Sequence, residues 1–135
     1  MTPEKWTTSP DGEVVEVTRS AIPSIVAHTS IGELEICETC YWHGLPSYLT
    51  SQDLAEIHYQ FGLEYRDRQL FERSVECLTE GRRLSETADV VAALALSQSA
   101  LGRDAIAAAL YRRALELDPS HFIARENLKQ IDARG

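Results

Sequence analysis

The sequence predicts an all-α fold, and two observations lead to that prediction. The first is that residues of matching size recur at a fixed offset of 33 positions in the second half of the chain. The matched pairs are Gly62 and Ala95, Ser74 and Ala107, Leu78 and Tyr111, and Gly81 and Ala114. The second is that apolar residues there follow helical spacing rather than alternation. A period of this length is typical of stacked helical hairpins, each too small to bury its own apolar face.

The second copy of the repeat shows the pattern most clearly. Valine, leucine and alanine at helical spacing predict a helix over 89–101. Gly102 then suits a left-handed helix end, and Asp104 suits the N-cap of the next helix. That helix is expected from about 105 to 117, because the residue before Pro119 is pushed out of helical geometry.

The first copy and the end of the chain complete the expected helices. Thr50 and Asp53 form a capping pair, which predicts a helix from 51 to about 66. A short turn and a second helix over 70–84 follow. A fifth helix is expected over 121–133. Its predicted buried residues are Phe122, Ile123, Leu128 and Ile131. The sequence therefore predicts five helices between residues 51 and 134.

Residues 88–121 carry a resemblance to a known family. Small residues stand at Ala95, Ala107 and Ala114, large ones at Leu94 and Tyr111, and the segment ends in Leu115, Leu117, Asp118 and Pro119. This pattern resembles the tetratricopeptide repeat (TPR) family. The sequence departs from it at Gln98, where an aromatic is usual, and at Glu86, where the first copy lacks the proline. The first copy does keep an aromatic, Tyr65.

The resemblance covers about residues 52–135 and implies a short right-handed α-α superhelix. It assigns one TPR domain to residues 51–135, with repeats at about 55–87 and 88–121 and a solvating cap helix at about 121–133. Two repeats and a cap are fewer than the three repeats usually needed for stability. We therefore expect the preceding segment to pack on the array, or the chain to associate with another molecule.

The first fifty residues are expected to form a partly helical extension. Residues 1–12 read as a disordered lead-in, and residues 13–18 look strand-like. A short helix is expected after Pro23 within residues 21–30, and a second helix over 31–43. We interpret residues 13–50 as a degenerate helical hairpin packed against the first repeat.

This extension holds the one motif with reactive side chains, Cys37-x-x-Cys40-x-x-His43. Thiolates and imidazole are zinc ligands, and a fourth ligand would have to be His28, His58 or Cys77. A redox interpretation lacks the strand-then-helix context and the flanking residues of thioredoxin-like proteins. The third interpretation is that the cysteines pack as small apolar residues in a helical core.

Other function classes receive little support from the sequence. The chain contains no Gly-rich phosphate loop, nucleophile elbow or His-Glu-x-x-His motif, so we expect no enzyme and no cofactor. The formal net charge is −8, of which residues 1–50 contribute −5, and this balance argues against nucleic acid. An acidic face either attracts a basic partner or keeps the protein soluble. Without a long apolar run, the expected location is the cytoplasm rather than a membrane.

The resemblance implies a partner-binding groove lined by the first helix of each hairpin. The residues that it assigns to the groove are Glu56, Tyr59, Leu63, Arg66, Asp89, Ala92, Leu96 and Ser99, with Glu126 and Gln130 from the cap helix. This mixture fits an extended peptide or an amphipathic helix. Family members that clamp the C-terminal carboxylate of chaperones have Lys and Asn where Tyr59 and Leu63 stand, so that partner is not expected.

Three functional hypotheses follow. The first is a noncatalytic adaptor or small chaperone that binds a peptide or helix of another protein in the groove, by analogy with the acidic repeat-containing chaperones of bacterial secretion systems. The second is a metal- or redox-responsive module that uses Cys37, Cys40 and His43. The third is a self-associating scaffold, a homo-oligomer in which exposed hairpin ends stack between chains.

Overall fold

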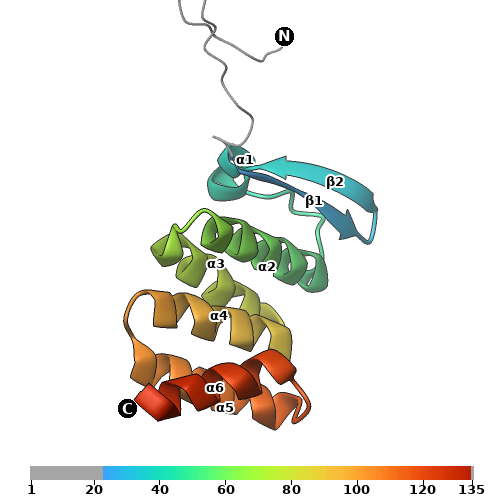
Figure 1. Ribbon diagram of the computed structural model, residues 1–135. Coiled ribbons are helices and arrows are strands. Elements are labelled where there is room, and N and C mark those ends of the chain that lie inside the picture. The colour runs from blue at the N-terminus through green and yellow to red at the C-terminus, as the bar shows by residue number, and fades with distance from the viewer. Residues whose placement is uncertain (1–22, 135) are drawn as a thin grey trace, which may run out of the picture.

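The computed structural model describes residues 23–134, which form a stack of helices with a β-hairpin and a short helix at one end (Figure 1). The elements are β1 (Ser24–Thr29), β2 (Gly32–Cys37), α1 (Glu38–His43), α2 (Ser51–Asp67), α3 (Phe71–Leu84), α4 (Ala88–Ala100), α5 (Asp104–Leu117) and α6 (Phe122–Arg134). The described chain is therefore mostly helical but includes a small sheet. The lead-in and strand-like segment expected over 1–18 lie outside the described residues.

The five helices predicted between 51 and 134 are confirmed, each to within one residue at either end. The capping pair of α2 is also confirmed, because Thr50 Oγ1 accepts from the Asp53 N–H at 3.0 Å and Asp53 accepts from the Thr50 N–H at 3.1 Å. The predicted N-cap at Asp104 is wrong. Arg103 caps α5 without a side-chain hydrogen bond, and the Asp104 carboxylate accepts from Ser99 and Arg134 instead, each at 3.1 Å.

The 33-residue period of the sequence is also present in the backbone. The ends of α2 and α4, the starts of α3 and α5, and the ends of α3 and α5 are each 33 positions apart. The intervening turns match as well, because Gln69 (φ 64°) and Gly102 (φ 81°) both adopt the left-handed conformation and are separated by 33 positions. Each turn therefore reverses the chain in the same way, and each helix packs against the next.

All eight residues of the matched pairs are buried, which explains why most of them are small. A Cβ added at Gly62 would clash with the side chain of Leu78, so α2 and α3 approach closely there. Ser74 donates to the Gly62 carbonyl at 2.8 Å and shares a 2.8 Å hydrogen bond with Ser97. These bonds satisfy the two buried hydroxyls, which would otherwise be costly to bury.

The predicted helices over 21–30 and 31–43 are wrong, because most of this segment is an antiparallel β-hairpin with Ile25 opposite Ile36. Burial alternates along β1, where Ile25 and Ala27 are buried and Val26 and His28 are exposed. A period of two is the spacing of a half-buried strand. Two turn residues join the strands, and Gly32 follows at φ 116°, a conformation that other residues rarely adopt. Of the second predicted helix only α1 remains.

The hairpin packs against α2, so the helical hairpin expected there is replaced by strands. Side chains from β1, β2 and α1 share a core cluster with α2, and its buried members are Ile25, Ala27, Ile36, Tyr41, Leu49, Ile57, Phe61, Tyr65 and Cys77. The turn is tied to α2 as well, because the Ser30 N–H and hydroxyl donate to the two oxygens of Asp53 at 3.0 and 2.8 Å. The face of α2 that carries Ile57, Phe61 and Tyr65 is therefore covered by the hairpin and α1.

The last helix differs from expectation in one respect. Ile131 is buried and Leu128 packs against the core, but Phe122 and Ile123 are 64% and 55% exposed. The prediction that α6 buries all four residues is therefore wrong for its first turn. Within residues 23–134, no helix is both long and apolar enough to cross a bilayer.

Candidate functional site

Two adjoining hollows lie along α2 and α4, and together we call them the α2–α4 groove. The first has a volume of about 140 Å³ and is lined by Gln52, Ala55, Glu56, Tyr59, Ser85, Thr87, Asp89 and Val90. The second has a volume of about 130 Å³ and is lined by Tyr59, Arg66, Asp89, Ala92, Ala93, Leu96, His121 and Ile123. Tyr59 and Asp89 line both, so the two hollows adjoin each other.

Six of the ten residues expected to line the groove do so, namely Glu56, Tyr59, Arg66, Asp89, Ala92 and Leu96. The other four lie elsewhere. Leu63 is half-buried against the core, and Ser99 donates to Asp104 at the turn into α5. Glu126 pairs with Lys129 on α6, and Gln130 is an exposed residue of the same helix. The prediction omitted eight lining residues, and two of them, His121 and Ile123, lie where α6 begins. The other six are Gln52, Ala55, Ser85, Thr87, Val90 and Ala93.

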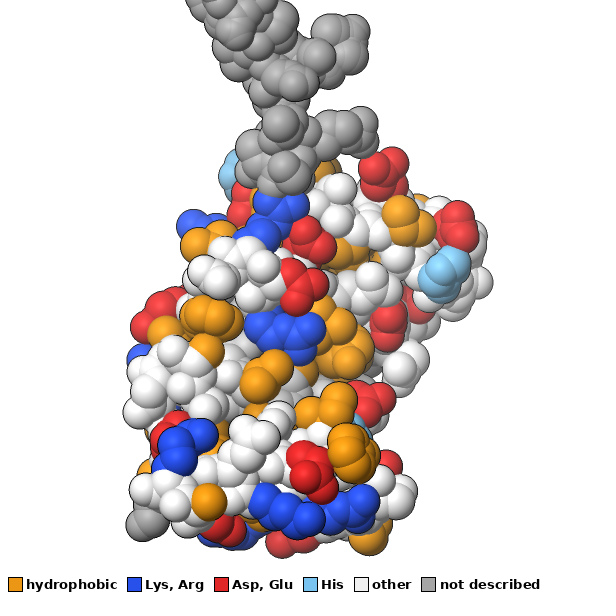
Figure 2. Space-filling model, in the orientation of Figure 1, with side chains coloured by type: hydrophobic (Ala, Val, Ile, Leu, Met, Phe, Trp, Pro, Cys, Tyr) orange, Lys and Arg blue, Asp and Glu red, His pale blue; other side chains and the backbone are white. Residues whose placement is uncertain are grey.

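The floor of the second hollow is apolar because α4 is rich in alanine. Ala92 and Ala93 are buried, and their single methyl groups leave space between α2, α4 and the start of α6. Leu96 and Ile123, which are 36% and 55% exposed, form the apolar sides. Figure 2 shows orange apolar side chains exposed along the helical region, interspersed with acidic and basic ones. Apolar surface rimmed by polar residues is characteristic of interaction sites.

The rim of the groove is polar and carries more negative than positive charge. His121 Nδ1 accepts from the Ala124 N–H at 3.2 Å, so the neutral imidazole carries its proton on Nε2 and donates it to Asp89 at 2.8 Å. Glu56 accepts from Gln60 at 2.7 Å. Burial, and secondarily the negative charge of Asp89, raises the pKa of Tyr59. The Tyr59 hydroxyl therefore stays protonated in the groove.

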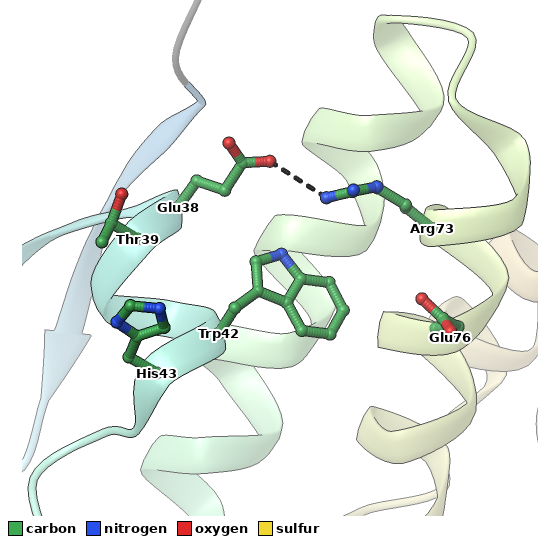
Figure 3. A pocket seen from close by; sticks show the side chains of 6 residues that line it. All are labelled: Glu38, Thr39, Trp42, His43, Arg73 and Glu76. Atoms are coloured by element: carbon green, nitrogen blue, oxygen red, sulfur yellow. Dashed lines mark hydrogen bonds and ion pairs between the residues drawn. The ribbon is translucent and has the colours of Figure 1, made fainter.

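A larger hollow of about 410 Å³ lies between α1 and α3 (Figure 3). It is lined by Glu38, Thr39, Trp42, His43, Arg73 and Glu76, with Glu38 and Arg73 reaching toward each other across it. Arg73 is 3.4 Å from the Glu38 carboxylate and lies over the rings of Trp42 and Tyr65 at 5.9 and 5.8 Å.

Three of the side chains that line this hollow, Glu38, Trp42 and Arg73, belong to one network with Tyr65. Trp42 Nε1 donates to the Tyr65 hydroxyl at 2.7 Å, and that hydroxyl donates to Glu38 at 2.5 Å. Burial, followed by the Glu38 carboxylate, raises the pKa of Tyr65, so it remains the donor. Because Glu38, Arg73 and the Trp42 N–H already have partners, the network holds α1 against α2 and α3. We assign the hollow a structural role despite its size.

The cysteine motif lies at the junction of β2 and α1. Cys37 is the N-cap of α1, and Cys40 is the third residue of the helix and is exposed. No group of three or more His, Cys, Asp or Glu side chains within residues 23–134 is arranged to hold a metal ion, so the structure does not bring the zinc ligand set together. The redox interpretation lacked a strand followed by a helix, and the structure has this arrangement. The segment that was predicted to be one helix, 31–43, consists of strand β2 followed by helix α1.

No protein-family model matches this chain, and no curated protein matches it. The TPR resemblance therefore depends on the quoted residues and on the 33-residue period.

Proposed function

We propose that the protein is a noncatalytic interaction module that binds a segment of a partner protein, an extended peptide or an amphipathic helix, in the α2–α4 groove. The observation that carries the proposal is that two hollows adjoin at Tyr59 and Asp89, with an apolar floor in the second hollow and acidic residues on the rim. The proposal treats the chain as a cytoplasmic adaptor or small chaperone. Its substrate is a polypeptide, so it requires no cofactor.

In this proposal, helices α2 and α3 form one TPR hairpin and helices α4 and α5 form a second. The two hairpins make a short right-handed superhelix, and α6 is the cap helix. The support is the recurrence of helix ends and left-handed turns at 33 residues, together with burial of all eight matched residues. Helical repeats of this kind use their surfaces for binding, because each repeat contacts only its neighbours and leaves an extended face open.

The chemistry of the groove describes the partner. An apolar side chain fits the second hollow, where Ala92, Leu96 and Ile123 provide hydrocarbon contacts. A basic side chain nearby would meet Asp89 or Glu56, which outnumber Arg66 in the groove. The formal net charge of −8 adds a long-range attraction for a basic segment. We therefore expect an amphipathic segment that combines apolar and basic residues.

The experiment is a selection from a displayed library of random peptides against the full chain, followed by measurement of Kd for the enriched sequence. We expect enrichment of apolar residues next to Lys or Arg. Leu96→Arg, which introduces a charge into the second hollow, should weaken binding by about tenfold or more, equivalent to about 1.4 kcal/mol.

The matched control is Ile106→Arg, because Ile106 is an exposed apolar residue of α5 that lines neither hollow. It should leave Kd unchanged. If Ile106→Arg weakens binding as much as Leu96→Arg does, or if neither does, the peptide binds elsewhere and the proposed function is wrong.

A further inference from the structure

We propose that Cys37 and Cys40 form a reversible thiol–disulfide exchange site whose substrate is a small-molecule disulfide such as glutathione disulfide. The site lies at the end of β2, away from the α2–α4 groove, and does not depend on the groove's function. Three features support it: the backbone geometry of the pair, its contrast with the third cysteine, and the anchoring of α1.

The backbone brings the two side chains together over the first turn of α1. Cys37 is extended (φ −90°, ψ 166°) as the N-cap, and Cys40 is the third helical residue. Thr50 and Asp53 hold the same two places in α2, and there each side chain hydrogen-bonds to the other residue's N–H. The motif therefore places two thiols at positions where, in α2, each side chain reaches back to the other residue. A disulfide needs close Cβ atoms that point toward each other, which this arrangement favours.

The three cysteines have two different environments. Cys40 is exposed and Cys37 is partly exposed, whereas Cys77 is 1% exposed within the core. Burial raises the pKa of Cys77 to about 11. The pKa of Cys37 is held below its ordinary value, first by the Cys40 N–H and then by the Cys40 thiol. The contact between the Cys37 side chain and the Cys40 N–H is too poorly aligned to count as a capping hydrogen bond. Because the thiolate is the nucleophile, Cys37 is the attacking group and Cys77 is inert.

The two residues that follow Cys40 are fixed by contacts with α2, so the thiols can react without releasing the helix. Tyr41 stacks on Phe61 with ring centroids 4.2 Å apart, and its hydroxyl is 2.5 Å from His58 Nδ1. Trp42 is held by Tyr65 in the network between α1 and α3. These contacts involve neither Cys37 nor Cys40. The first turn of α1 therefore presents the thiol pair on an anchored support.

The exchange proceeds in two displacements. The Cys37 thiolate attacks one sulfur of glutathione disulfide, which forms a mixed disulfide and releases one glutathione thiolate that takes up a proton. The Cys40 thiol then loses its proton and attacks the Cys37 sulfur, which forms the Cys37–Cys40 disulfide and releases the second glutathione. The protein dithiol loses two electrons and two protons, and glutathione disulfide is reduced to two glutathione thiols.

The test equilibrates the full chain in buffers with graded ratios of glutathione to glutathione disulfide, followed by alkylation and peptide mapping by mass spectrometry. Wild type should convert to the Cys37–Cys40 disulfide and return to the dithiol as the ratio rises, with Cys77 remaining a thiol. Cys40→Ser should instead accumulate one glutathione on Cys37, because the resolving thiol is gone. Cys77→Ala is the control and should retain the reversible disulfide.

The wild-type protein alone can overturn the inference, whether or not the variants fold. A chain that keeps both thiols in excess glutathione disulfide lacks the site. Stable glutathionylation of wild-type Cys37, or a disulfide to Cys77, would also contradict the proposed pairing. None of these results bears on peptide binding in the groove, so the two proposals fail separately.

Discussion

The two hydrophobic clusters of the described chain are built in different ways. The cluster spanning α3 to α6 contains seven buried alanines, and the helices approach closely over them. The cluster beneath the β-hairpin is built around aromatic rings, where Tyr41, Phe61 and Tyr65 pack together. Its elements are also tied by side-chain hydrogen bonds, such as Ser30 to Asp53 and Trp42 to Tyr65. Small residues therefore set the spacing between the repeated helices, whereas aromatic and polar contacts hold the unrepeated end in place.

The largest expected effect comes from emptying the aromatic cluster. Phe61 is fully buried between Tyr41 and Tyr65, so Phe61→Ala should lower the free energy of unfolding by about 3–5 kcal/mol. Chemical denaturation measures the loss, and the exposed Ile106→Ala control should change stability by less than about 0.5 kcal/mol. Hydrogen exchange should accelerate more in β1 and β2 than in α6. Equal losses for the two variants would contradict the account of this cluster.

The alanine-rich cluster should instead be sensitive to added volume. Ala95 is fully buried where helices pack closely, so Ala95→Leu should destabilise the protein by about 1–3 kcal/mol through overpacking. Ile57→Leu keeps the volume of a buried residue in the aromatic cluster and should cost less than about 1.5 kcal/mol. Thermal melts compare the two variants directly. If Ala95→Leu stabilises the protein, the helices are not in close contact there.

The two regions should also lose stability over different pH ranges. Burial lowers the pKa of His58, and the nearby charges of Glu80 and Arg83 oppose each other. The unfolded imidazole then binds a proton below pH 6.5 while the folded one does not, so stability falls as pH drops below that value. Arg113 and Arg82 lower the pKa of Glu86 to about 2, so its contribution is present above pH 4.5 and is lost as pH falls toward 2.

Denaturant midpoints measured from pH 8 to pH 3 check whether His58 and Glu86 affect stability in these two pH ranges. His58→Gln should flatten the profile between pH 6.5 and 5. Glu86→Gln should lower the midpoint by a constant amount above about pH 5 and should flatten the profile only below that pH. A profile that His58→Gln leaves unchanged in the upper range would mean that protonation of His58 is not linked to folding.

The smallest expected effect is at the surface of the junction between α1 and α3. The Arg73 side chain is half exposed, so its ion pair with Glu38 is screened by solvent. Arg73→Gln should cost no more than about 1 kcal/mol, measured by chemical denaturation. A loss as large as that of Phe61→Ala would show that the polar network, rather than the aromatic packing, holds α1 in place.

The same difference explains what could be predicted from the sequence. In the repeated part, helical spacing, the Thr50–Asp53 pair and Gly102 are local signals, and they located five helices. In the unrepeated part, the alternation of Ile25 and Ala27 is a short signal that the apolar run around it obscured. A two-residue turn ahead of Gly32 could have revealed the hairpin. The β-hairpin's contact with α2 has no local signal.

The lining of the groove was predicted in part, as the fold was. Residues of α2 and α4 were identified because the resemblance gives the exposed face of the first helix in each hairpin. His121 and Ile123 were missed because the way α6 begins against α4 depends on tertiary packing, which leaves Ile123 exposed beside Leu96. For the cysteines, the wrong secondary structure over 31–43 concealed the strand-to-helix junction on which the redox interpretation depends.

The most direct test of the central claim is hydrogen exchange of the full chain with and without the peptide selected for binding. The account predicts added protection in the segments that line the groove, the exposed turns of α2 and α4 and the start of α6 near Ile123. It predicts no change in β2 or in the outer face of α5 near Ile106. Protection confined to the β-hairpin or to α5, with the α2–α4 groove unchanged, would contradict it.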